Sequence, residues 1–302
     1  TVHFPIWHPE IEDILVLKNN KGTEDNRVRR MDYSIQISKL FYERFMNEGD
    51  ITLISPHMAP GLYEAFGTEE FDDLYLKYEA DKTIPKKTVP AQDLFFDLLK
   101  ERAETGRIYI MNLDHCNSHS SFKDKVSMSN LCQEITLPTT PIQHPDDDQG
   151  EIALCILSAV NVGALNDLSE LDNICDLSVR ALEQIIDYQD YPVKAAEVST
   201  KKRRSLGIGY IGLAHYLAKN GVKYSDPKAW ELVDRLSEAF QYHLLRASCD
   251  IAKEKGKCEG FERTKYADGL LPIDHYKKEV DEIVPHKQRM AWESLRKDIA
   301  KY

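Results

Sequence analysis

Short apolar runs alternate with longer amphipathic stretches along the whole chain of 302 residues. Runs that are apolar or that alternate apolar with polar residues predict strands at 1–6, 51–55, 107–113, 130–137, 152–162 and 206–211. Apolar residues three or four positions apart predict helices at 31–47, 69–79, 91–104, 168–188, 227–254, 273–283 and 287–301. Strands separated by helices pair mostly in parallel, so the sequence predicts an α/β fold.

Charge and cysteine content narrow the class of protein. The chain carries 39 Lys and Arg against 50 Asp and Glu, a formal charge of −11, which disfavours binding to nucleic acid or to an anionic membrane. No apolar run approaches the roughly 18 residues of a membrane helix. The six cysteines include no CxxC pair, so we expect free thiols in a reducing, cytoplasmic setting rather than a disulfide framework.

Two motifs suggest functions that their context weakens. Residues 207–212 (GIGYIG) match the GxGxxG fingerprint of dinucleotide binding, but the basic run 201–204 (KKRR) stands where an apolar strand should lead into it. We expect a glycine-bearing strand after a solvated basic loop, and an NAD-dependent oxidoreductase remains an alternative. Residues 114–119 (DHCNSH) lack the second Cys/His pair of a zinc site, so we expect a polar turn and no metal.

The segment 129–135 (SNLCQEI) carries the most suggestive set of side chains. If it is extended, Asn130, Cys132 and Glu134 share one face. An amide, a thiol and a carboxylate in a row are costly to bury, yet they suit catalysis by a reactive sulfur, a general base and an orienting amide. A polar strand face is the alternative. Cys155 lies in a second predicted extended run, where it either faces the same pocket or packs in the core.

Two of these runs, SNLCQEITLPT and GEIALCILSAVNVGA, closely resemble the large, catalytic subunit of class I ribonucleotide reductase. The resemblance continues in family order through WHPEIEDILVLKNNKG, NRVRRMDYSIQISKLFYERF, TGRIYIMNLDHCNSH, RRSLGIGYIG, GLLPIDHYKK and WESLRKDI. It implies part of the family's ten-stranded α/β barrel, made of two antiparallel halves of parallel strands, with the active-site cysteine on a loop inside the barrel. It also implies reduction of ribonucleoside diphosphates to 2′-deoxyribonucleoside diphosphates by thiyl-radical chemistry.

The resemblance assigns a role to each candidate residue. Cys132 matches the cysteine that becomes a thiyl radical, and Glu134 matches the general base for the 3′-hydroxyl. Asn130 matches the amide that hydrogen-bonds the ribose hydroxyls. Cys155 matches one of two cysteines that end as a redox-active disulfide, its partner lying upstream of this chain. The substrate-binding stretch is expected to comprise Asn130, Leu131, Cys132, Gln133 and Glu134.

The resemblance further implies what the chain works with. No cofactor is expected to bind this chain directly, because the radical comes from a small subunit with a dinuclear metal–tyrosyl centre and nucleotide effectors bind segments absent here. Thioredoxin or glutaredoxin is the expected reductant. Residues 1–302 are expected to be one part of the catalytic barrel domain, without its regulatory region, first strands and C-terminal tail. We therefore expect a split or truncated subunit that needs complementing pieces, or, alternatively, a non-catalytic remnant acting as a scaffold.

Overall fold

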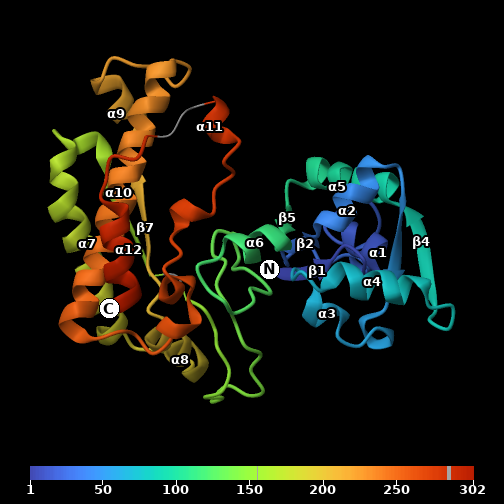
Figure 1. Ribbon diagram of the computed structural model, residues 1–302. Coiled ribbons are helices and arrows are strands. Elements are labelled where there is room, and N and C mark those ends of the chain that lie inside the picture. The colour runs from blue at the N-terminus through green and yellow to red at the C-terminus, as the bar shows by residue number, and fades with distance from the viewer. Residues whose placement is uncertain (155, 284–286) are drawn as a thin grey trace. The chain divides into compact units, whose positions relative to one another are not determined.

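The computed structural model describes residues 1–154, 156–283 and 287–302. They form two compact units, one made of Thr1–Ser120 and Lys125–Pro138 and the other of Ser121–Asp124 and Thr139–Tyr302. Each unit combines helices with strands, which confirms the α/β prediction (Figure 1). Within the described ranges, no helix is both long enough and apolar enough to cross a membrane.

The first unit contains a parallel sheet in the order β1-β2-β5 and a separate antiparallel pair, β3 and β4. Helices α2 and α5 pack side by side (Figure 1). The strands are β1 (Val2–Pro5), β2 (Tyr33–Ile37), β3 (Asp50–Ile54), β4 (Lys86–Pro90) and β5 (Ile108–Asn112). The helices are α1 (Ile11–Leu15), α2 (Lys39–Met46), α3 (Leu62–Ala65), α4 (Phe71–Ala80), α5 (Ala91–Thr105) and α6 (Leu113–His119).

Strand β2 is the centre of this sheet, and its two faces differ in chemistry. Tyr33, Ile35 and Ile37 belong to the hydrophobic core, whereas Ser34 and Gln36 alternate with them and point to the opposite face. All five residues are buried, so both faces of the strand are covered. The predicted helix 31–47 is therefore wrong in its first half, where pairing with β1 and β5 makes a strand. Its second half is confirmed as α2.

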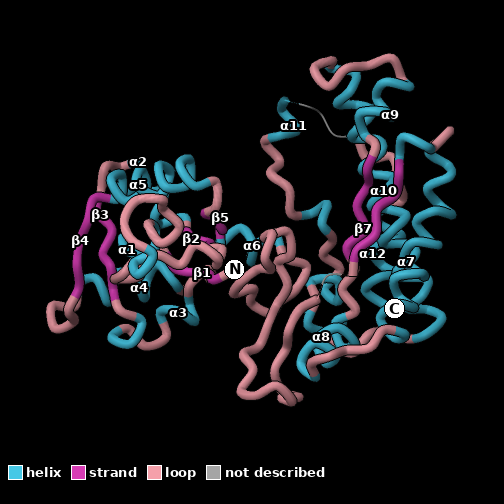
Figure 2. The backbone as a smooth tube through the Cα atoms, turned by 180° about the vertical axis from the view of Figure 1, so that it is seen from behind, coloured by secondary structure: helices cyan, strands magenta, loops and turns pink. Residues whose placement is uncertain are grey.

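The second unit pairs β6 (Leu157–Asn161) in parallel with β7 (Gly207–Ile211). The long helices α7 (Leu171–Tyr188) and α10 (Pro227–Lys255) pack against each other, and α7 also contacts β6 (Figure 2). The remaining helices are α8 (Lys194–Arg203), α9 (Leu213–Lys219), α11 (Val280–Ile283) and α12 (Trp292–Lys301). The buried thiols of Cys175 and Cys249 belong to the core of this unit.

Several other predicted elements differ from the structure. Residues 130–137 contain a turn and loop rather than a strand, and within 152–162 strand β6 covers Leu157–Asn161. Residues 273–283 are mostly irregular, with α11 covering only the last four. The basic run 201–204, expected as a loop, forms the C-terminal turn of α8 and its cap. Taken one at a time, neither unit closes a barrel with its described residues.

The glycines of 207–212 serve the backbone of the second unit. Gly207 and Gly209 lie inside strand β7, whereas a dinucleotide fingerprint places its glycines in the turn that follows a strand. Gly212 stands between β7 and α9 with φ of +79°, in the left-handed region that glycine adopts without strain. A Cβ atom on Gly212 would lie 2.4 Å from Oδ1 of Asn161. This arrangement gives the NAD-dependent alternative no support.

Gly212→Ala is expected to destabilise the second unit, while Gly209→Ala is not. The left-handed backbone alone costs an alanine about 1–2 kcal/mol, and the contact with Asn161 adds to that cost. A Cβ atom on Gly209 would meet nothing within 4 Å, so the same substitution three residues earlier is the matched control. Urea titration of both variants checks the difference, and equal midpoints would contradict this account of Gly212.

Candidate functional site

The segment that carries Cys132 folds into a tight turn. The Gln133 N–H donates to the carbonyl of Asn130 at 3.2 Å, and Gln133 has φ of +64°, which is rare for a residue other than glycine. The Asn130 side-chain oxygen accepts from the Ile135 N–H at 3.1 Å and from the Ser129 hydroxyl at 3.2 Å. Since the segment turns here, the strict alternation expected for an extended strand does not hold. Asn130 instead stabilises the loop's own backbone.

The loop is attached to the polar face of the sheet. The Gln133 side chain accepts from Ser34 Oγ and donates to the carbonyl of Ile110, both at 2.7 Å. Gln36 Nε2 donates to the carbonyl of Ser127 at 2.7 Å. The alternating polar residues of β2 therefore bind the segment that bears Cys132.

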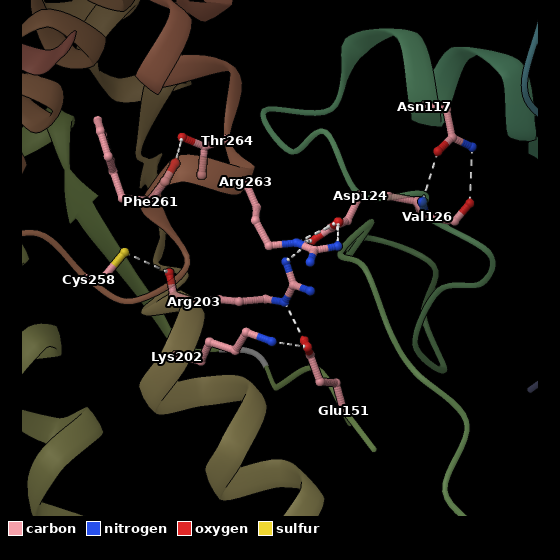
Figure 3. A network of polar contacts seen from close by, with 10 residues as sticks. All are labelled: Asn117, Asp124, Val126, Glu151, Lys202, Arg203, Cys258, Phe261, Arg263 and Thr264. Atoms are coloured by element: carbon pink, nitrogen blue, oxygen red, sulfur yellow. Dashed lines mark hydrogen bonds and ion pairs between the residues drawn. The ribbon is translucent and has the colours of Figure 1, made fainter. Parts of the chain in front are cut away.

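Two further contacts hold the same segment within the first unit. His3 Nε2 lies 3.0 Å from the carbonyl oxygen of Ser129 and 3.3 Å from the Ser129 backbone nitrogen, and burial lowers the pKa of this histidine. Asn117 of α6 accepts from the Val126 N–H at 2.8 Å and donates to the Val126 carbonyl at 3.0 Å (Figure 3). Along the chain, the attachment points thus run from Val126 to Gln133.

Sequence reasoning missed these anchoring residues. Ser34 and Gln36 lay inside a predicted helix, and the helical interpretation hid the alternation of polar with apolar residues in YSIQI. That alternation was the available signal for a strand with one polar face. His3 gave no signal of its own, because a single histidine in a predicted strand has many structural uses.

The Cys132 thiol and the Glu134 carboxylate are both exposed. Within the part of the chain that the structure describes, neither group has a hydrogen-bond or ion-pair partner, so both remain available to a ligand. Cys155 lies outside the described residues. Burial raises the pKa of the Cys116 and Cys258 thiols and raises that of Cys175 to about 12. Among the described cysteines, Cys132 is the exposed one, whereas Cys116 and Cys258 are half-buried and Cys175 and Cys249 are buried.

The other polar clusters have structural explanations. The expected turn at 114–119 is instead helix α6, in which Asp114 accepts the Lys39 N–H at the start of α2. The rings of His115 and His119, one helical turn apart, meet edge to face. In the described ranges no group of three or more His, Cys, Asp or Glu side chains is placed to hold a metal ion.

The basic run 201–204 is a centre of ion pairs rather than a solvated loop. Arg203 lies between Glu151 and Asp124, donating to both carboxylates (Figure 3). Lys202 donates to Glu151 at 2.7 Å, and Arg263 donates to Asp124. The side chains of Arg203 and Glu151 are 5% and 6% exposed, so this is a buried network. It joins four segments of the second unit.

The attached loop of this α/β chain exposes the Cys132 thiol two residues from the exposed Glu134 carboxylate. Such a pair suits enzyme chemistry at a cysteine sulfur. The family model of the ribonucleotide reductase barrel domain matches residues 1–302, so the chain belongs to that family.

The curated relatives agree with this assignment. The chain is 56% identical to a ribonucleoside-diphosphate reductase subunit alpha of Haemophilus influenzae, over 100% of this chain and 41% of that protein. It is 53% identical to ribonucleoside-diphosphate reductase 1 subunit alpha of Escherichia coli, over 99% of this chain and 40% of that protein. The enterobacteria phage T4 subunit alpha is 43% identical, over 99% of this chain and 40% of that protein. The chain thus spans about two fifths of the length of these relatives.

Proposed function

We propose that this chain is the part of a ribonucleoside-diphosphate reductase α subunit that presents the reactive thiol to the substrate. The observation that carries the proposal is the placement of Cys132. Cys132 is exposed on a turn that the Gln133 side chain and the Ser127 carbonyl attach to the sheet. The relatives named above are ribonucleoside-diphosphate reductase α subunits, and they align with 99–100% of this chain.

The proposed chemistry gives Cys132 and Glu134 separate roles. A thiyl radical on Cys132 takes the hydrogen atom from C3′ of the ribose, and the Glu134 carboxylate takes the proton of the 3′-hydroxyl. The 2′-hydroxyl leaves as water with a proton from a dithiol formed by Cys155 and a cysteine outside this chain. The same dithiol supplies a second proton and the two electrons that reduce the sugar, and it ends as a disulfide. Glu134 returns its proton to the 3′-oxygen. Return of the hydrogen atom to C3′ restores the radical on Cys132.

Asn130 has two roles in this proposal, one in the loop and one in substrate binding. Its side-chain oxygen accepts two hydrogen bonds within the loop, which fixes the plane of the amide. The amide nitrogen carries the donors, so it is the end that would bind a ribose hydroxyl oxygen. A rigid amide of this kind restricts the sugar to one orientation over the sulfur.

The proposed assembly extends beyond the chain. The two units would contribute strands to a ten-stranded barrel completed by other segments of the α subunit. A small subunit with a dinuclear metal–tyrosyl centre would supply the radical, and thioredoxin or glutaredoxin would reduce the disulfide. The test is an assay of dCDP formation from CDP. It uses the full α subunit, which includes this chain, together with the small subunit. Absence of dCDP despite formation of the subunit complex would overturn the proposed function.

Glu134→Gln in this assembled enzyme is expected to lower kcat by about 10²–10⁴-fold and to change KM little. A glutamine keeps the shape of the side chain but cannot accept the 3′-hydroxyl proton, and general-base catalysis is worth about that factor. Glu69→Gln is the matched control, because Glu69 is exposed in the same unit and lies outside the loop. An equal loss of kcat in both variants would remove Glu134 from its proposed role.

A further inference from the structure

We propose that Ser34 and Gln36, on the buried polar face of β2, are positioning residues that set the place of the Cys132 sulfur through a two-point attachment of its loop. This inference rests on the proposed function for its catalytic meaning. The attachment itself is a feature of the first unit and is testable without any activity. Neither residue touches the thiol, so both act through the loop backbone.

The first point of attachment follows Cys132 directly. The amide of Gln133 lies across two neighbouring strands, accepting from Ser34 Oγ of β2 and donating to the Ile110 carbonyl of β5, each at 2.7 Å. Because both the oxygen and the nitrogen of the amide are bound, the side chain is fixed relative to both strands. The left-handed backbone of Gln133 is unfavourable by itself. These hydrogen bonds therefore also stabilise a backbone conformation that the unattached segment would not keep.

The second point of attachment precedes Cys132 by five residues. Gln36 is fully buried, and its Nε2 donates to the Ser127 carbonyl at 2.7 Å. A carbonyl only accepts, which fixes the orientation of the amide. In the part of the chain that the structure describes, Gln36 Oε1 is then left buried without a hydrogen-bond partner. A leucine would fill this space without that cost, so the donor to Ser127 is the feature that the glutamine adds.

The position of the sulfur depends on these contacts because the thiol has none of its own. Cys132 is exposed and, among the described residues, makes no hydrogen bond. Its place is set by the backbone between Ser127 and Gln133. Transfer of a hydrogen atom needs the reacting atoms close together, and a displacement of about 1 Å can cost about 10²-fold in rate.

Hydrogen exchange in the chain itself tests the attachment. Ser34→Ala and Gln36→Leu are expected to speed exchange of the amides in 126–137 by at least about 10-fold, while exchange in α5 stays unchanged. Gln92→Leu is the matched control, because Gln92 Nε2 also donates to a backbone carbonyl, that of Phe45, away from the loop. Unchanged exchange of 126–137 in both variants would overturn the attachment, whatever the enzyme does.

Turnover in the full α subunit with its small subunit tests the catalytic meaning. Ser34→Ala is expected to lower kcat by about 10²-fold with KM within about 3-fold of wild type, and Ser34→Thr to restore much of it by restoring the hydroxyl. Faster exchange with wild-type kcat would show that the attachment does not position the sulfur. Wild-type protein without any dCDP formation would defeat the proposed function but leave the exchange result standing.

Discussion

Cys132→Ser in the full α subunit is expected to abolish CDP reduction and to leave the fold unchanged. A hydroxyl cannot replace the thiol, because its O–H bond is stronger than S–H and resists formation of the radical that the proposed reaction needs. The substitution is nearly isosteric. The Cys132 side chain is exposed and, in the described ranges, has no hydrogen-bond partner, so no structural contact is lost. Formation of dCDP and the hydrogen exchange of 126–137 are the two measurements.

Cys116→Ser is the control for this result, since Cys116 lies in α6 of the same unit and is half-buried. That variant is expected to keep turnover. Limited alkylation of the native chain gives a second check, because burial raises the pKa of the Cys116 and Cys258 thiols, whereas Cys132 is exposed. Iodoacetamide should modify Cys132 ahead of these two. Persistent dCDP formation by Cys132→Ser would remove the proposed radical role.

Local sequence signals predicted the elements whose stability is local. Helix α5 follows its apolar periodicity and ends where Gly106 takes a φ of +63°, and α10 begins at Pro227 as its sequence indicates. Strand β2 was missed, because the apolar residues Ile37, Phe41 and Phe45 recur every four positions, as on one face of a helix. Only hydrogen bonding to β1 and β5 decides the conformation there. Tertiary contacts overrode the local pattern.

The sequence predicted which residues make up the candidate site but not how the loop that carries them folds. The residues of SNLCQEI were recognisable from their types and from family resemblance, and their catalytic roles stay predictions. The turn at Gln133 depends on Ser34, which is 99 positions away in the sequence. Likewise, the partners of Arg203 lie 52 and 79 positions away, so a basic run that looks solvated becomes buried. Patterns of neighbouring residues do not predict contacts between residues so far apart in the sequence.

Arg203→Met is expected to lower the free energy of unfolding of the second unit by about 3 kcal/mol. Removing one member of a buried ion pair leaves the other charge poorly compensated, which costs about 3–5 kcal/mol. The lower value applies here, because Lys202 still binds Glu151 and Arg263 still binds Asp124. Methionine keeps apolar bulk beside Phe122, whose ring lies 5.4 Å from the guanidinium carbon.

The Arg203 prediction also has a pH signature. Burial alone would raise the pKa of Asp124 and Glu151, but hydrogen bonds from Arg263, Arg203 and Lys202 outweigh it and hold each pKa below its usual value. A lowered folded-state pKa stabilises the protein above the ordinary carboxylate pKa, and that stability is lost as the pH falls through the folded-state value. The difference between wild type and Arg203→Met should therefore shrink below about pH 4.

Urea titration monitored by hydrogen exchange in α8 measures this loss, with α5 of the first unit as the internal reference. Arg263→Met is the matched control, because Arg263 binds the same Asp124 from a side chain that is 60% exposed, and solvent screens such a pair. Its loss of stability should be much smaller. An equal loss in both variants would mean that the burial of Arg203 adds nothing. A loss in Arg203→Met that persists unchanged below pH 4 would mean that packing, rather than the carboxylates, makes Arg203 important.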